Sequence, residues 1–203
     1  MSIPFQDSET AKNLLRAFAG ESQARNRYDF AANLCQKQEL QAMAFIFQAT
    51  AKQEQAHAKV FWDHLQALNG QNLPIYGAYP IEGTNRILEL LRAAQHNEHE
   101  EHGSVYPSFA AIATQEGFPE AAASFRQIAA IEQLHGERFG LLADQLESGT
   151  LFVSQIETGW MCLNCGHTQN SLEAPKQCPV CNHGQGWFIR LELAPWSPVV
   201  KQT

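Results

Sequence analysis

The sequence contains no long hydrophobic run and has an excess of negative charge, and each of these features excludes a class of function. No stretch of about 18 apolar residues occurs, so we expect no membrane-spanning helix. Lys and Arg number 14 against 21 Asp and Glu, which gives a net charge of -7 and argues against a nucleic-acid surface. The first residues lack a basic stretch followed by an apolar run, so we expect no signal peptide and a cytoplasmic protein.

Cysteine is also scarce, and its distribution is uneven. The chain has 5 cysteines, and four of them lie in the last quarter as two C-x-x-C pairs. In a chain without an export signal, this pattern indicates metal binding rather than disulfides. The remaining cysteine, Cys35, falls late in a helical segment and is expected to be a buried small apolar side chain.

Hydrophobic periodicity predicts four long helices in the first three quarters of the chain. Their expected ranges are about 7–36, 39–69, 84–116 and 119–147. Asp7 or Ser8 can cap the first helix, and Thr84 or Asn85 the third. Pro107 lies inside the third range and should bend that helix.

The lengths of the connections predict how these helices are arranged. Two joints are short and indicate antiparallel pairs, whereas residues 69–83 form a long connection with Gly and Pro. At about 3.3 Å per residue it reaches roughly 50 Å, enough to run the length of a long helix. One long crossover between two helical hairpins is the ferritin-like four-helix bundle. We therefore expect a mainly α fold, with this bundle over 1–149 and a small metal domain over 150–203.

Ionisable residues interrupt the apolar faces of all four predicted helices. The second helix carries Glu54-x-x-His57 and the fourth carries Glu132-x-x-His135. Residues three apart share a helix face, so each pair can point at one metal ion. The other two helices contribute three further glutamates on their apolar stripes, namely Glu21, Glu98 and Glu101. All seven residues lie near mid-helix, so the bundle should bring them to one level.

Five carboxylates in one apolar interior require compensating cations. Without them, mutual repulsion and lost hydration would be too costly. A single Glu-x-x-His is common and usually solvated, but two at matching heights with further buried glutamates favour a two-metal site. Oxygen-rich ligation with one imidazole per metal suits iron or manganese better than zinc.

The cysteine pairs form a second predicted metal site. Cys162 and Cys165 make the first pair, and Cys178 and Cys181 make the second. Each pair supplies two thiolates, and four thiolates close a tetrahedral site. The spacing does not distinguish iron from zinc, because zinc ribbons have similar patterns.

These motifs together resemble the rubrerythrin family over nearly the whole chain. The segment Glu21 to Tyr28 reads ESQARNRY, and Glu98-x-x-Glu101 stands five residues before Tyr106-Pro107. The tail resembles the shortened rubredoxin-like domain of that family. The resemblance implies a peroxidase that protects cells from hydrogen peroxide. It also implies two non-haem irons with oxo and carboxylate bridges, and a third iron on the four cysteines.

The resemblance further implies a role for each matching residue. The positions of Glu54 and Glu132 bridge the irons, and those of Glu21 and Glu98 bind one iron each. The position of His135 binds the second iron. The first iron moves between the positions of Glu101 when oxidised and His57 when reduced. Two tyrosines are expected to hydrogen-bond the carboxylates, namely Tyr28 and Tyr106.

The expected partners follow from the same interpretation. Electrons would come from rubredoxin or an NADH-dependent reductase. The short linker after the fourth helix should hold the cysteine domain far from mid-bundle. We therefore expect a homodimer, head-to-tail or with swapped helical hairpins, in which one chain's cysteine site serves the other's di-iron site.

Three other functions remain open at this stage. A ferritin-like protein that oxidises and handles iron would share the bundle, although the cysteine domain is unusual for one. A metal-stabilised scaffold with zinc on the cysteines would be colourless and redox-inactive. A di-manganese catalase would need no electron-supplying domain.

Overall fold

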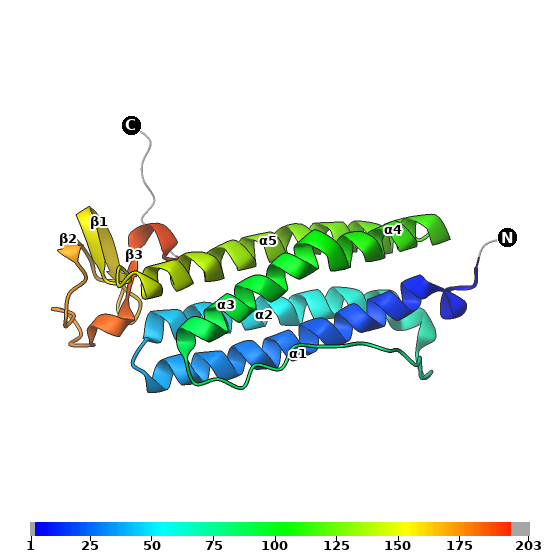
Figure 1. Ribbon diagram of the computed structural model, residues 1–203, viewed down its shortest axis with the longest axis horizontal. Helices are drawn as coiled ribbons and strands as arrows, with labels where there is room; N and C mark the ends of the chain where they lie inside the picture. The colour runs from blue at the N-terminus through cyan, green and yellow to red at the C-terminus, as the bar shows by residue number, and fades with distance from the viewer. Residues whose placement is uncertain (1–2, 196–203) are drawn as a thin grey trace.

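Long helices make up most of the molecule (Figure 1). The computed structural model describes residues 3–195. The continuous helices are α1 (Glu9–Lys37), α2 (Gln41–His64) and α5 (Pro119–Glu147). A fourth rod consists of α3 (Ile87–Glu100), the π-helical turn η3 (Glu101–Val105) and α4 (Tyr106–Glu116). Short 3-10 turns are η1 (Phe5–Asp7), η2 (Leu65–Leu68), η4 (Gln185–Trp187) and η5 (Leu191–Leu193). Residues 1–2 and 196–203, which belong to the expected domain ranges 1–149 and 150–203, lie outside the described part.

Helix ends follow the local signals in the sequence. The side chain of Ser8 accepts a hydrogen bond from the Ala11 amide at 3.1 Å and caps α1. Gly117 has φ 87°, a left-handed conformation that ends α4 with little strain in glycine. The two short joints and the four helical rods are therefore confirmed.

The third predicted helix is wrong in two details. It begins at Ile87, and Arg86 is the capping residue, while the Thr84 hydroxyl accepts a hydrogen bond from the Arg86 amide at 3.2 Å. It is also interrupted before Pro107 by a π-helical turn that the sequence did not predict. The Tyr106 amide instead bonds the Glu101 carbonyl, five residues back. Proline lacks an amide proton and its ring crowds the carbonyl four residues before it, so a wider turn precedes Pro107.

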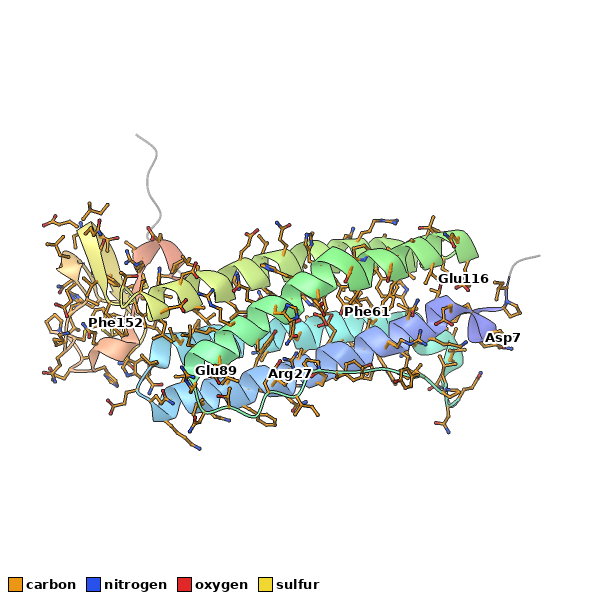
Figure 2. The ribbon with its side chains drawn as sticks, viewed as in Figure 1. Asp7, Arg27, Phe61, Glu89, Glu116 and Phe152 are labelled. Carbon is orange, nitrogen blue, oxygen red and sulfur yellow. The ribbon has the colours of Figure 1, made fainter. Side chains whose placement is uncertain are left out.

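The long connection predicted between the two hairpins is confirmed. We call residues 69–86 the crossover; it has no regular secondary structure and runs along α1 (Figure 1). Arg16 Nε donates to the Tyr76 carbonyl at 2.9 Å, and the Tyr79 hydroxyl donates to the Arg16 carbonyl at 2.9 Å. Arg27, labelled in Figure 2, pairs with Glu82 at 2.7 Å. These contacts fix the crossover to α1 along its length.

The bundle has two apolar clusters, one toward each end. One contains Phe61, which lies between the helices in Figure 2, with Leu14 and Phe125. The other contains Phe47 and Phe139 with further apolar side chains. Phe47 and Phe139 stack with ring centroids 5.0 Å apart. Buried ionisable side chains lie at the level between these clusters.

The chain after α5 forms a small sheet at the end of the bundle where α1 turns into α2 (Figure 1). Its strands are β1 (Val153–Cys162), β2 (Thr168–Glu173) and β3 (Phe188–Arg190), antiparallel in the order β2-β1-β3. Met161 and Ile189 join the nearer apolar cluster of the bundle. We call residues 150–195 the cysteine module. None of the helices in residues 3–195 combines the length and apolar character needed to cross a membrane.

Candidate metal centres

Six of the seven ionisable residues predicted as ligands in the bundle are buried, with at most 6% of their surface exposed: Glu21, Glu54, His57, Glu98, Glu132 and His135. They form two groups of four, and the ligand atoms of each group lie within 4.8 Å of one another. One group contains Glu21 and His57, and the other contains Glu98 and His135. Glu54 and Glu132 belong to both groups, so these two carboxylates lie between two sites.

The oxygens of the shared carboxylates are divided between the two imidazoles. Glu132 directs Oε1 to His57 Nδ1 at 2.9 Å and Oε2 to His135 Nδ1 at 2.8 Å. Glu54 directs Oε2 to His57 Nδ1 at 3.1 Å and Oε1 to His135 Nδ1 at 3.0 Å. Each carboxylate can therefore offer one oxygen to each of two metal ions.

Two buried carboxylate oxygens of this cluster, Glu21 Oε2 and Glu98 Oε2, have no hydrogen-bond partner among the described residues, and each lies 3.9 Å from an imidazole Nδ1. Leaving carboxylate oxygens dry and unpaired costs free energy that a cation would restore. The donor set of carboxylates with one imidazole per group suits iron or manganese. The residues present therefore fit two such ions.

The pKa values of the cluster show that its carboxylates need nearby positive charge. Burial raises the pKa of Glu21 and of Glu98 well above the usual range. Burial also acts to raise the pKa of Glu54, but the adjoining imidazoles outweigh it and hold that pKa at about 2. Burial lowers the pKa values of the histidines, yet contacts with Glu132 and Glu54 raise them to about 10 for His57 and about 9 for His135. Metal binding would release these imidazole protons, so affinity for metal should increase with pH.

Tyrosines and one glutamine orient the ligands. As expected, the Tyr106 hydroxyl donates to Glu21 Oε1 and the Tyr28 hydroxyl donates to Glu98 Oε1. His135 Nε2 donates to Gln53 Oε1 at 2.9 Å, which leaves Nδ1 for the cluster. Sequence reasoning missed Gln53 because it lies one residue off the apolar stripe of α2. Its position beside Glu54 was the available signal.

Glu101 is the predicted ligand that lies outside both groups. It begins the π-helical turn η3 and is half-buried. Burial, and then the charges of Glu132 and Glu54, raise its pKa to about 8. In this structure His57, and not Glu101, therefore completes the first group.

The four cysteines of the module form a compact site without disulfides. Their sulfurs all lie within 4.8 Å of one another, and the Cys162–Cys181 and Cys165–Cys178 sulfur pairs are each 3.7 Å apart. A tetrahedron with metal–sulfur bonds of about 2.3 Å has edges of about 3.8 Å. The spacing therefore fits one four-coordinate metal ion.

The backbone around the cysteines favours thiolates. A turn follows each cysteine pair, with Gly166 at φ 76° in one and Asn182 at φ 61° in the other. The His183 amide is the main cause that lowers the pKa of Cys181 to about 5. Burial raises the pKa of Cys162 to about 12, so a metal ion must supply the charge that keeps this thiol ionised.

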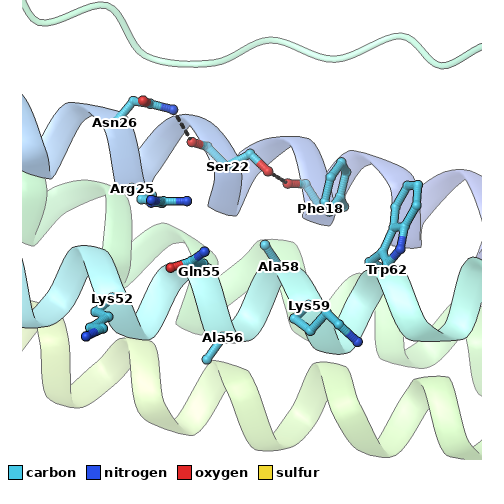
Figure 3. Close-up of a pocket in the computed structure, with 10 residues that line it drawn as sticks. All are labelled: Phe18, Ser22, Arg25, Asn26, Lys52, Gln55, Ala56, Ala58, Lys59 and Trp62. Atoms are coloured by element: carbon cyan, nitrogen blue, oxygen red, sulfur yellow. Dashed lines mark hydrogen bonds between the residues drawn. The ribbon is translucent and has the colours of Figure 1, made fainter.

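A groove on the surface lies away from both centres. It has a volume of about 760 Å³ on the outer surface between α1 and α2, with Phe18 and Trp62 at one end (Figure 3). Arg25, Lys52 and Lys59 also line it, and among the described residues none of the cluster carboxylates does.

Comparisons with known proteins agree with both centres. The rubrerythrin family model matches residues 12–143, and the model of the rubrerythrin rubredoxin-like domain matches residues 160–189. Rubrerythrin of Porphyromonas gingivalis is 44% identical over 93% of this chain and 92% of its own length. A structure of fully reduced nigerythrin is 25% identical with a TM-score of 0.61, covering 94% of this chain and 88% of that one.

The fold also matches a more distant structure. Bacterioferritin of Mycobacterium tuberculosis is 18% identical with a TM-score of 0.60, covering 70% of this chain and 88% of its own. At this identity the likeness establishes the fold alone, which is the expected ferritin-like bundle. With two family models matched in order and a relative at 44% identity over nearly the whole chain, the protein belongs to the rubrerythrin family.

Proposed function

We propose that this protein reduces hydrogen peroxide to water at a non-haem di-iron centre and receives electrons through a tetracysteine iron centre. Two ligand groups that share Glu54 and Glu132, in one chain with a four-thiol site, support this proposal most strongly. Such an enzyme would protect the cytoplasm of its cell from peroxide.

Each metal would have its own set of protein ligands. Glu21 and His57 would hold one iron and Glu98 and His135 the other, with both shared carboxylates as bridges. Glu101 would replace His57 when the first iron is oxidised. Two ferrous ions there would supply the two electrons needed to cleave the O–O bond, with two protons completing the formation of two water molecules.

The protein controls the surroundings of this chemistry. Tyr106 holds one oxygen of Glu21, and Tyr28 holds one oxygen of Glu98. The other oxygen of each glutamate remains available to the cluster. Apolar side chains above and below the cluster exclude bulk water, which strengthens its electrostatic interactions. Gln53 holds the ring of His135 in one orientation.

Electron delivery in this proposal involves a second chain. Because α5 ends fifteen residues after Glu132, the cysteine module begins roughly 20 Å along the axis from the cluster. Met161 and Ile189 pack the module against the bundle end, so it does not swing back freely. A homodimer, head-to-tail or with swapped hairpins, would bring the cysteine centre of one chain to the other's cluster. Rubredoxin or an NADH-dependent reductase would refill the cysteine centre.

The test is metal analysis and visible spectroscopy on protein purified without air. We expect iron in both centres, bleaching and recovery of the iron–thiolate absorbance, and NADH-coupled peroxide consumption when a reductase is added. A colourless protein with zinc on its cysteines and no response to peroxide would contradict the proposal.

Oxidation and handling of iron is the second candidate function, because the same buried carboxylate and histidine groups could bind and oxidise Fe²⁺. It predicts that added Fe²⁺ is oxidised by dioxygen and that hundreds of irons accumulate in each particle. The cysteine module argues for the peroxidase, because storage of iron does not require repeated reduction of the centre.

A further inference from the structure

A cavity of about 240 Å³ lies beside the carboxylate cluster. The crossover forms one wall of it through residues 77–80, α1 forms another, and the rod of α3, η3 and α4 forms the third. A water molecule occupies about 30 Å³ of liquid, so the cavity has room for several molecules of that size. Hydrogen peroxide, a small polar molecule, would fit within it.

Two residues that line the cavity connect it to the cluster. Tyr106 lines it, and its hydroxyl donates a hydrogen bond to Glu21. Glu101 lines it too and is only half-buried, whereas the carboxylates of both ligand groups are fully buried. The cavity therefore adjoins the cluster at Glu101 and Tyr106.

Gly20 lines the cavity between the crossover and Glu101. A β-carbon at this position would lie 3.6 Å from Cε1 of Tyr79 and 3.8 Å from Oε1 of Glu101. It would touch both without overlapping either, so it would fill the gap between the crossover and the cluster. Glycine inside a helix lowers stability relative to alanine, so α1 carries an unfavourable residue at the position where a side chain would obstruct passage.

Tyr79 is held in place on the other side of this gap. Its hydroxyl donates to the Arg16 carbonyl at 2.9 Å, and Arg16 in turn donates to the Tyr76 carbonyl at 2.9 Å. The ion pair between Arg27 and Glu82 fixes the crossover farther along. The Tyr79 ring is therefore a fixed wall of this gap.

We propose that this cavity is the substrate route to the cluster and that Gly20 and Tyr79 set its width, admitting hydrogen peroxide in preference to bulky organic hydroperoxides. This inference rests on the proposed peroxidase function. The crossover therefore has a second role besides joining the hairpins, since it forms the outer wall of the route.

The test compares hydrogen peroxide with tert-butyl hydroperoxide on the iron-loaded protein. Gly20→Ala should lower kcat/KM for hydrogen peroxide roughly tenfold, with kcat within about twofold, because a methyl group narrows the route without altering a ligand. Its melting temperature should equal or exceed that of the wild type. Tyr79→Ala should raise kcat/KM for tert-butyl hydroperoxide about tenfold.

Two control variants separate the effect of the width of the route from other effects of the substitutions. Gly83→Ala makes the same change in the crossover, where a β-carbon would have no neighbour within 4 Å, and should leave both substrates unaffected. Tyr79→Phe keeps the ring and should keep the preference for hydrogen peroxide. If kcat/KM for hydrogen peroxide were unchanged in Gly20→Ala, or kcat/KM for tert-butyl hydroperoxide were unchanged in Tyr79→Ala, while the wild type consumed hydrogen peroxide, the route would be refuted. If the wild type consumed neither peroxide, the proposed function itself would fail, and with it the substrate of this route.

Discussion

Gly186 of the cysteine module packs directly on Glu39, in the turn between α1 and α2. A β-carbon at residue 186 would lie 1.7 Å from the Glu39 carbonyl oxygen, so only glycine permits this contact. Glu39 itself has φ 60°, which turns the chain sharply at this point. The module is therefore seated on its own bundle by a backbone contact in addition to apolar side chains.

This contact predicts a marked effect of Gly186→Ala. The methyl group must displace backbone, so we expect a loss of about 1–3 kcal/mol in the free energy of unfolding and partial release of the module. Gly184→Ala is the matched control, because a β-carbon there would have no neighbour within 4 Å. Denaturation followed by iron–thiolate absorbance and by circular dichroism measures both effects. Equal stability of the two variants would contradict the seating.

Glu132 is the most informative residue of the cluster because it belongs to both ligand groups. Glu132→Ala should abolish peroxide turnover and remove the bundle iron, while the iron–thiolate absorbance stays intact. Glu137→Ala, at an exposed position on the same helix, should turn over normally. Iron analysis with steady-state kinetics makes this comparison, and unchanged turnover in Glu132→Ala would refute the ligand assignment.

Gln53 tests the orientation of His135. Gln53→Ala removes the acceptor for the ring N–H, so turnover should fall roughly tenfold to a hundredfold. Gln53→Glu retains an acceptor oxygen and should restore most of the activity. Gln55→Ala alters an exposed glutamine on the same helix and should have no effect. Equal activity in Gln53→Ala and Gln55→Ala would show that the hydrogen bond is dispensable.

Glu116 at the end of α4 predicts a pH dependence of stability. It accepts hydrogen bonds from the Glu9 amide at 3.0 Å and the Thr10 amide at 2.7 Å, which join α4 to the start of α1. Burial acts to raise its pKa, but these hydrogen bonds and that of the Thr10 hydroxyl outweigh it and lower the pKa. Its stabilisation is therefore complete above the unfolded-state pKa and is lost as pH falls through the lower folded-state value.

Glu116→Gln should accordingly cost about 1 kcal/mol of unfolding free energy at pH 7. The difference from the wild type should narrow below about pH 4, where the wild-type side chain also becomes neutral. Urea denaturation across this range measures it, with the exposed Glu157→Gln as control. A difference that stays constant with pH would show that the charge of Glu116 contributes nothing.

Most of the metal cluster follows from local patterns in the sequence. Residues three apart on an amphipathic helix must share its buried face, so Glu54 and His57 were predictable as a pair, as were Glu132 and His135. Because each cysteine pair is local, the four-thiol site was also predictable. The four long helices and the long connection over residues 69–83 together predicted the ferritin-like topology of the bundle.

Other features depend on contacts between residues distant in sequence. Gln53 meets His135 across 82 positions, and Gly20 separates Tyr79 from Glu101. Neither contact produces a periodic pattern in the sequence. The first depends on how two helices pack, and the second on how a helix packs against the crossover. The π-helical turn before Pro107 is a similar case, since a proline within a helix can be accommodated by a bend or by a wider turn.

The sequence by itself thus determined which side chains are buried together, because burial follows helical periodicity. Only the tertiary structure decided that Glu54 and Glu132 stand between two groups, that Glu101 lies outside them beside a cavity, and that Gly186 seats the cysteine module on the bundle. The physical reason is that periodicity fixes the face of a helix a residue occupies. The distance between two faces is set by packing of the whole molecule.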